Sequence, residues 1–233
     1  MEVARAAGGL RWKLASSSLA PLRLASTAAA AAPLRTPDNK PKTQQRVRRY
    51  VPEKVKSFVM NDGKLLTTRE NWIFFLKHDI EPDNGRMSQF FAGPDLQKVR
   101  KDFNVSLAFS PKHILHPHDL QWFDPRGHPL VAMKKADYAR KASEQPLWIM
   151  VTTFGAGPAV VRNLTQRRLT RAVHTALEAM GYQSATGLSP TKEIRGTFWA
   201  IMHDPVKAAK HSAERFGEVV AAALDKECSR PRT

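Results

Sequence analysis

Apolar and polar positions in the second half of the chain alternate between strand-like and helix-like patterns. Residues 147–154 read LWIMVTTF, a run rich in β-branched and aromatic side chains that predicts a strand. Residues 197–203 predict a second strand, and a short apolar run at 128–133 predicts a further one ahead of both. The polar residues 134–145 would then form a loose hairpin link.

A helix follows the strand at 147–154. Its apolar side chains recur with i, i+3, i+4, i+7 spacing at Leu169, Ala172, Val173, Ala176, Leu177 and Met180. Pro158 suits a first helical position, and Gly181 suits the end of the helix. Pro205 opens a last helix that extends to Leu224. The order β-β-α-β-α predicts an α/β fold, more closely an α+β sandwich.

The first half of the chain predicts fewer regular elements. A Thr-Thr-Arg-Glu start favours a short buried helix over 67–78, and residues 95–103 suit a second helix, followed by a loop-rich stretch. We therefore expect a helical and loop-rich extension over 58–126, a principal domain over 127–227 and a tail over 228–233.

The charge balance points to a polyanionic partner. Lysine and arginine total 37 against 21 acidic residues, which gives a formal net charge of +16. Nucleic acid is the leading candidate, and an anionic membrane surface is the second. Cys228 is the only cysteine, so the sequence excludes an internal disulfide and a multi-thiolate metal site. The sequence has no apolar run of about 18 residues, so we expect no membrane span.

The N-terminal segment has the composition of an organelle-import signal. Residues 1–32 are rich in Ala, Leu, Ser and Arg and contain one acid, Glu2. We expect a mitochondrial transit peptide and a matrix location; a disordered tail is the alternative. Residues 33–57 form a basic flexible linker or arm, whose Arg46, Arg48 and Arg49 would either lie in RNA grooves or be solvated.

Three histidines, His113, His116 and His118, form an HxxHxH cluster. Imidazoles bind zinc and similar metals, but the prolines of this region break it into loops that fix no tetrahedral arrangement. We expect surface histidines that face RNA phosphates. No metal or other cofactor is predicted, apart from Mg²⁺ held by bound RNA.

A cluster of basic residues marks the start of the helix after 147–154. Arg162, Arg167, Arg168 and Arg171 lie there, with Asn163 at the edge. A helical wheel points Arg167 and Arg171 away from the apolar stripe and puts Arg168 on its flank. Guanidinium groups match phosphate oxygens, and a helix N-terminus offers free N–H groups to the same anion. These residues are the predicted RNA-binding site.

This helix resembles one in the protein subunit of bacterial ribonuclease P. That family usually carries Gly-Asn-Ala-Val-x-Arg-Asn-Arg followed by Lys-Arg-Arg-Leu-Arg. The matching positions here are Gly157, Ala159, Val160, Arg162, Asn163, Arg167, Arg168 and Leu169. The resemblance extends over about residues 127–226. Leu164 stands where the family has an arginine, Gln166 replaces a lysine, and Pro158 replaces a common asparagine.

The resemblance implies a small α/β sandwich with a left-handed β-α-β crossover, shared with a domain of a small-subunit ribosomal protein. In the family the helix docks on catalytic RNA, a cleft on the sheet holds the 5′ leader of precursor tRNA, and RNA-bound magnesium performs the chemistry. It therefore implies an RNA-binding subunit without a catalytic residue or a small-molecule substrate of its own.

Four interpretations remain open. The first is a mitoribosomal protein that binds rRNA beside other mitoribosomal proteins, which the missing cations and the long extension favour. The second is a mitochondrial ribonuclease P subunit that assists 5′ maturation of precursor tRNA. The third is a nucleotide-binding enzyme, suggested by Gly155, Gly157 and Glu178 but opposed by Val160 at the third glycine position. The fourth is a helix whose arginines are merely solvated.

Overall fold

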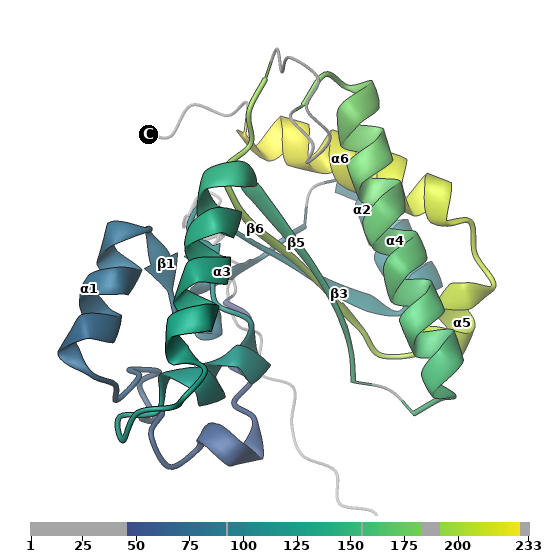
Figure 1. Cartoon of the computed structure of the whole chain (residues 1–233). Helices are drawn as coiled ribbons and strands as arrows, with labels where there is room; N and C mark the ends of the chain where they lie inside the picture. The colour runs from purple at the N-terminus through teal and green to yellow at the C-terminus, as the bar shows by residue number, and fades with distance from the viewer. Residues whose placement is uncertain (1–45, 92, 155, 183–191, 229–233) are drawn as a thin grey trace, which may run out of the picture. The chain divides into compact units, whose positions relative to one another are not determined.

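A four-stranded open sheet organises the chain, with strand order β2-β3-β6-β5 (Figure 1). The computed structural model describes residues 46–91, 93–154, 156–182 and 192–228. The strands are Ser88–Gln89 (β2), Val105–Ser110 (β3), Gly196–Met202 (β6) and Leu147–Thr153 (β5). β3 runs antiparallel to β2 and β6, and β5 runs parallel to β6. The protein is therefore of the mixed α+β class.

The central strand β6 is buried along its whole length. Phe198, Ala200 and Met202 face the larger apolar core, whereas Trp199 and Ile201 face a smaller one on the opposite side of the sheet. Burial on both faces explains why this strand is continuously apolar and does not alternate with polar residues.

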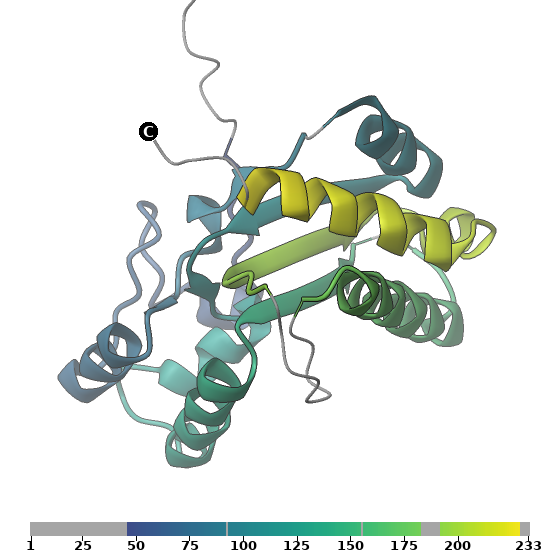
Figure 2. The same ribbon diagram turned by 90° about the horizontal axis from the view of Figure 1, so that it is seen from above.

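Helices cover one face of the sheet (Figures 1 and 2). They are Gly93–Phe103 (α2), Ala159–Ala179 (α4), Pro205–Ala209 (α5) and Ala213–Cys228 (α6). Buried side chains of all four pack with those of β3, β5 and β6 in the larger core. Gly217 of α6 lies directly against α4: a Cβ there would come within 2.5 Å of the carbonyl carbon of Ala172.

The other face carries a separate group of elements. They are the helices Arg69–Lys77 (α1) and Val131–Glu144 (α3), the 3₁₀ helices Glu53–Val55 (η1), Asn84–Arg86 (η2) and Pro117–Phe123 (η3), and the parallel strands Ile80–Glu81 (β1) and His113–Ile114 (β4). Phe75, Phe123, Tyr138 and Trp148 lie in the apolar core of this group. Trp148 belongs to β5, so it joins this group to the sheet.

Several predicted elements are confirmed. The helices α1, α2 and α4 and the strands β5 and β6 lie where the sequence pattern puts them. Thr68 caps α1 by accepting a hydrogen bond from the Asn71 amide at 3.4 Å. Gly181 follows α4 with φ +81°, the left-handed conformation expected of a glycine after a helix.

The predicted strand at 128–133 is wrong, and so is the loose hairpin link at 134–145. Helix α3 begins at Val131 and extends to Glu144. Its sequence, VAMKKADYARKASE, is dominated by good helix formers, whose propensity outweighs a short apolar run that fits either element. The order in this half is therefore α3-β5-α4-β6-α5-α6.

The predicted last helix is two helices. α5 ends at Ala209 and α6 begins at Ala213, where the Ser212 hydroxyl accepts a hydrogen bond from the Arg215 amide at 3.2 Å. A serine that binds the backbone in this way favours a new helix start over continuation of the old one.

The extension predicted over 58–126 contributes to the main sheet. β3 pairs with β6 over its full length, and the described residues lie within one compact unit, Thr43–Thr233. The main sheet therefore contains strands from both sides of the domain boundary predicted at residue 127. The predicted transit peptide, residues 33–45 of the arm and residues 229–233 of the tail lie outside the described residues. None of the helices in the described ranges is long and apolar enough to cross a bilayer.

Candidate nucleic-acid interface

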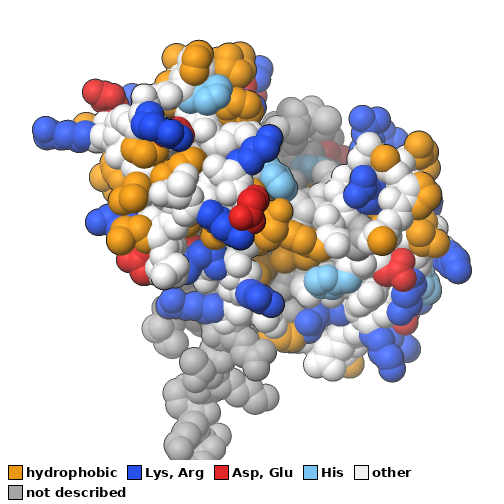
Figure 3. All heavy atoms as spheres, turned by 90° about the horizontal axis from the view of Figure 1, so that it is seen from below, with side chains coloured by type: hydrophobic (Ala, Val, Ile, Leu, Met, Phe, Trp, Pro, Cys, Tyr) orange, Lys and Arg blue, Asp and Glu red, His pale blue; other side chains and the backbone are white. Residues whose placement is uncertain are grey.

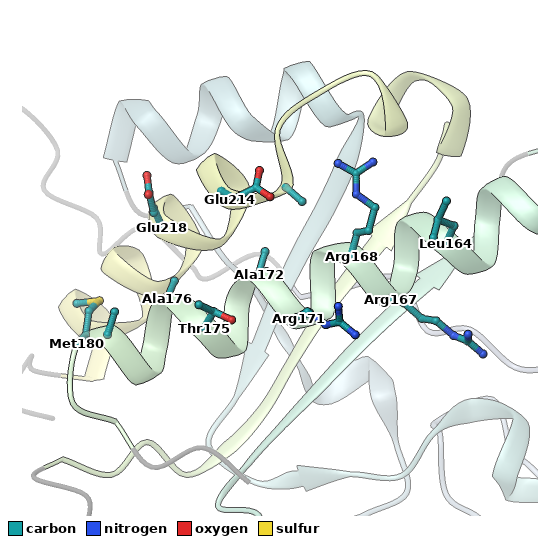
Figure 4. A pocket seen from close by; sticks show the side chains of 12 residues that line it. Leu164, Arg167, Arg168, Arg171, Ala172, Thr175, Ala176, Met180, Glu214 and Glu218 are labelled. Carbon is teal, nitrogen blue, oxygen red and sulfur yellow. The ribbon is translucent and has the colours of Figure 1, made fainter. Parts of the chain in front are cut away.

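Helix α4 positions the basic cluster by burying its opposite side. Leu169, Val173 and Leu177 are buried against the sheet, while Arg167, Arg168 and Arg171 are exposed. The exposure of these three arginines agrees with the helical wheel. Figure 4 shows Arg167 and Arg171 on the side of α4 that faces away from α6, and Arg168 on the side that faces α6. The three guanidinium groups thus divide between two sides of one helix.

These arginines have no carboxylate partner in the part of the chain that the structure describes. Among the described residues, no acidic oxygen lies within 4.0 Å of the guanidinium groups of Arg167, Arg168 or Arg171. Other arginines do pair with acids: Arg126 with Asp124 at 2.9 Å, for example. Unpaired, exposed guanidinium groups are the donors that phosphate oxygens require.

The side of α4 that faces α6 forms one wall of a groove of about 870 Å³. Arg168 lies on the α4 wall, and Glu214 and Glu218 lie on the α6 wall (Figure 4). The pKa of the Glu214 carboxyl is lowered by hydrogen bonds from its own backbone amide and from Ser212, and further by the charge of Arg168. Arg167 and Arg171 line the same groove, but Arg168 is the arginine whose charge acts on Glu214. An anion that approaches Arg168 therefore meets the strongest competition from a carboxylate.

Two apolar side chains stand beside the arginines. Val160 is 75% exposed and Leu164 is 56% exposed, one helical turn apart. Gln166, the other departure from the ribonuclease P pattern, points back to the sheet, where its amide donates to the Thr153 hydroxyl at 3.3 Å. Gln166 therefore has a local structural role. Leu164, in contrast, exposes an apolar side chain.

The first turn of α4 is open. Pro158 precedes the helix and provides no side-chain cap, so the first N–H groups lack that partner. Asn163 is exposed nearby, and Arg162 is half-buried and forms no ion pair with any residue that the structure describes. These two predicted residues therefore lie beside uncapped helix amides.

The arm divides into exposed and structural arginines. Arg46 and Arg48 are exposed. Arg49 donates to both carboxylate oxygens of Asp83 at 2.7 and 2.9 Å and to the carbonyls of Asn61 and Asp62. The hydrogen bond with Asp83 raises the pKa of Arg49. Arg49 therefore holds the arm to the fold, and we exclude it from the candidate interface.

The folded part of the arm lies at the carboxyl end of β5. The ring of Tyr50 makes an edge contact with that of Phe154, with 4.5 Å between the centroids. Phe154 directly follows β5, whose chain leads into α4. Arg48, two residues before Tyr50, is thereby brought to the end of the sheet that leads into α4. Lys and Arg side chains are scattered over the face drawn in Figure 3, with apolar and some acidic side chains between them.

The expectation of surface histidines is wrong for His113. Its ring is 1% exposed and stacks on Trp148 at 4.4 Å between centroids. Burial, helped by the charge of Arg195, lowers the pKa of His113 to about 4, so the ring is neutral near pH 7. His116 is half-buried, and His118 is exposed. No group of three or more potential ligands in the described ranges is arranged to hold a metal ion.

A polar cluster near β5 was not predicted. The Tyr138 hydroxyl donates to Asp119 at 2.6 Å, and the Trp122 indole donates to the other oxygen at 3.1 Å. The ammonium of Lys141 lies 4.5 Å from the centre of the Trp148 ring, and burial lowers its pKa. No spacing signal links these residues, because they come from η3, α3 and β5 and meet only through the fold.

The glycine fingerprint of nucleotide-binding enzymes gains no support from the geometry. Glu178 lies inside α4, not at the end of the next strand where such an acid contacts the ribose. Gly155 lies outside the described residues.

No protein-family model, no curated protein and no solved structure matches this chain. The interpretation of α4 therefore depends on its own residues and their geometry.

Proposed function

We propose that this protein binds RNA through the exposed arginine face of α4 and serves as a non-catalytic component of the mitochondrial ribosome, with rRNA as its ligand. The observation that carries the proposal is that Arg167, Arg168 and Arg171 are exposed on one helix, and no acidic side chain of the described residues lies within ion-pair distance of them. Arg167 and Arg171 provide the main contacts, because Arg168 faces Glu214 across the groove.

Phosphate binding at this face releases counterions, which provides affinity without base recognition. The uncapped amides at the start of α4 and the exposed Asn163 add donors for phosphate or a 2′-hydroxyl. Arg46 and Arg48 extend the basic surface to the arm. Magnesium enters only with the bound RNA.

The resemblance to the ribonuclease P protein implies a fold of that type, with a left-handed crossover from β5 through α4 to β6. A β-α-β crossover is supported by the adjacent parallel strands β5 and β6 and the helix α4 between them. The left hand is an expectation from the resemblance alone. A ribonuclease P subunit that assists precursor tRNA maturation is the second candidate. The exposed Val160 and Leu164 beside the arginines favour the first, because a ribosomal site offers protein as well as RNA contacts.

The RNA interface is tested with a double variant, Arg167→Ala with Arg171→Ala. Removal of two phosphate contacts is expected to weaken RNA binding and to reduce the slope of log K against log salt by about one to two. The matched control is Arg69→Ala with Lys77→Ala on α1, which removes the same charge from exposed positions of another helix. Equal slopes for the two variants would remove α4 from the interface.

The identity of the RNA is tested by crosslinking in mitochondria, followed by sequencing of the bound RNA. Predominant rRNA reads support the ribosomal proposal. Predominant precursor tRNA with a separate catalytic RNA supports the ribonuclease P candidate instead. The matrix location, supported by the composition of residues 1–32, predicts that isolated mitochondria import and cleave the full chain.

A further inference from the structure

Helices α4 and α6 lie side by side and enclose a long groove between them (Figures 1 and 4). The groove has a volume of about 870 Å³, and its α4 wall extends from Leu164 to Met180. At a rise of about 1.5 Å per residue, this wall is about 24 Å long, which corresponds to about four turns of a helix. The groove is therefore long enough to hold a further helix.

The floor of the groove is apolar. It consists of half-buried alanine and methionine side chains of α4 and one buried alanine of α6: Ala172, Ala176, Met180 and Ala213. Leu164, 56% exposed, lies at one end. Water in contact with such side chains is displaced most favourably by another apolar surface. Alanines also let a neighbouring helix approach closely, because the distance between packed helices depends on the side chains at the contact.

The two walls of the groove carry opposite charges. The charged side chains that line it in the described part of the chain are three arginines of α4 and two glutamates of α6: Arg167, Arg168, Arg171, Glu214 and Glu218. All five are exposed. Arg167 and Arg171 point away from α6, whereas Arg168 is on the side that faces it (Figure 4). The groove is thus basic along one side and acidic along the other.

Arg168 and Glu214 face each other across the groove without forming an ion pair. Hydrogen bonds from its own amide and from Ser212, and then the charge of Arg168, lower the pKa of Glu214, so this carboxyl is ionised at neutral pH. No carboxylate of the described residues lies within 4.0 Å of the Arg168 guanidinium. Exposed charges beyond ion-pair distance interact weakly. Each wall can therefore still gain a close counter-charge from an occupant.

This charge pattern discriminates between kinds of occupant. RNA and an anionic lipid surface carry charges of one sign, so the acidic wall of α6 repels them while the basic wall of α4 attracts them. A purely basic segment meets the reverse conflict at the three arginines. A helix with acidic side chains along one edge, basic side chains along the other and an apolar ridge between them matches both walls and the floor.

We propose that the groove between α4 and α6 binds an amphipathic helix of a partner protein whose two polar edges carry opposite charges. The apolar ridge of that helix packs on Ala172 and Ala176. Its acidic edge faces the arginines of α4, with Arg168 as the nearest, and its basic edge faces Glu214 and Glu218. This partner site goes beyond RNA binding and does not depend on it.

The experiment uses the full chain and synthetic helical peptides of about 18 residues, long enough for a wall of this length. All carry leucines at helical spacing, except for a scrambled control. One has glutamates along one edge and lysines along the other, a second has glutamates on both edges, and a third has lysines on both. Fluorescence anisotropy is expected to show that the mixed-edge peptide binds at least about tenfold more tightly than the others, because it alone compensates both walls.

Charge reversal identifies the two walls. Glu214→Lys with Glu218→Lys makes both walls basic, so the all-glutamate peptide should become the tightest binder, by about tenfold or more. Arg168→Glu places an acid on the α4 wall and should weaken the mixed-edge peptide by about tenfold.

A bulky side chain locates the peptide in the groove. Thr175→Trp fills the groove from an exposed position of α4 and should abolish binding of the mixed-edge peptide. The matched control Ala222→Trp places the same ring at an exposed position of α6 outside the groove lining and should bind the peptide as the wild type does. Both substituted positions are exposed, so both variants should fold, which circular dichroism checks.

Failure of this proposal is distinct from failure of RNA binding. Thr175→Trp should lose the peptide and keep RNA affinity, whereas Arg167→Ala with Arg171→Ala should lose RNA affinity and still prefer the mixed-edge peptide to the scrambled one. The proposal is overturned if no peptide binds, if all four bind equally, if charge reversal leaves their order unchanged, or if Thr175→Trp binds like the wild type. A wild-type dimer in sedimentation that Thr175→Trp dissociates would also overturn it, because the occupant would then be a second copy of this chain.

Discussion

Gly217 is the position at which α4 and α6 come closest, and its replacement by alanine should destabilise the protein. The residue is buried, and an added Cβ would lie 2.5 Å from the Ala172 carbonyl carbon and 3.1 Å from the Ala172 Cβ. Carbon atoms in normal contact are about 3.5–4.0 Å apart, so one helix must move by about 1 Å. Because the nearest obstacle is backbone, no change of side-chain rotamer relieves it.

Two opposing terms set the size of the effect. Overpacking of a close-packed core costs about 1–3 kcal/mol or more. Alanine is a better helix former than glycine, and this difference stabilises the variant by about 0.5–1 kcal/mol. We therefore expect a net loss of about 1–2 kcal/mol, since the helices must separate along a contact that also includes Ala176 and Val220. This loss lowers the urea midpoint by about 0.5–1 M, given an m-value near 2 kcal/mol/M.

The assay is urea unfolding followed by circular dichroism. Ala222→Gly, at an exposed position of the same helix, measures the propensity term alone and should destabilise by about 1 kcal/mol. The double variant Gly217→Ala with Ala172→Gly removes the Cβ–Cβ contact but not the clash with the carbonyl, so it should not recover wild-type stability. A Gly217→Ala protein as stable as the wild type, or more stable, would refute the reasoning.

Two further predictions concern buried polar groups. Arg49→Met leaves Asp83, whose side chain is 5% exposed, with Arg86 at 3.9 Å as its remaining ion-pair partner. Breaking a buried pair costs about 3–5 kcal/mol, and the partial exposure of Arg49 together with the remaining Arg86 places the expected loss in urea unfolding at about 2–3 kcal/mol. A loss below about 0.5 kcal/mol would mean that the pair behaves as a surface ion pair. His113 has a pKa of about 4 in the folded protein against 6.5 unfolded, so the unfolded chain binds more protons between these values. The stability it contributes is complete above about pH 6.5 and is lost as pH falls towards 4, with a slope of at most about 1.4 kcal/mol per pH unit. His113→Phe keeps the ring stack on Trp148 and should flatten the measured slope by up to one proton; an unchanged slope would count against the assignment.

Long, strongly periodic segments were predictable from the sequence. The apolar stripe of α4 and the capping residues around it indicate the helix, its buried face and its exposed arginines, because these depend on local spacing. β3 was missed although VSLAFS alternates as a strand should. Its histidine-rich and proline-rich surroundings suggested loops, and its true partner, β6, is distant in sequence.

The candidate sites differ in the same way. The α4 arginines were found because they lie within one helix. The role of Arg49 could not be read from the sequence, because Asp83 is remote in the chain and its burial is a property of the folded protein. The polar cluster near β5 was equally hidden: Tyr138 and Lys141 come from α3, a helix whose first residues fit a strand pattern at 128–133.

The position of β6 in the chain has a consequence for how the protein folds. Both of its partners, β3 and β5, precede it, and it is the strand that joins them into one sheet. A chain that emerges amino end first, in synthesis or in translocation, therefore cannot form its central ladder until Gly196–Met202 has appeared. Until then the edges of β3 and β5 that pair with β6 are exposed together with their apolar faces. Such surfaces promote aggregation and are bound by chaperones. A product truncated before β6 is accordingly a protease substrate and not a smaller working domain.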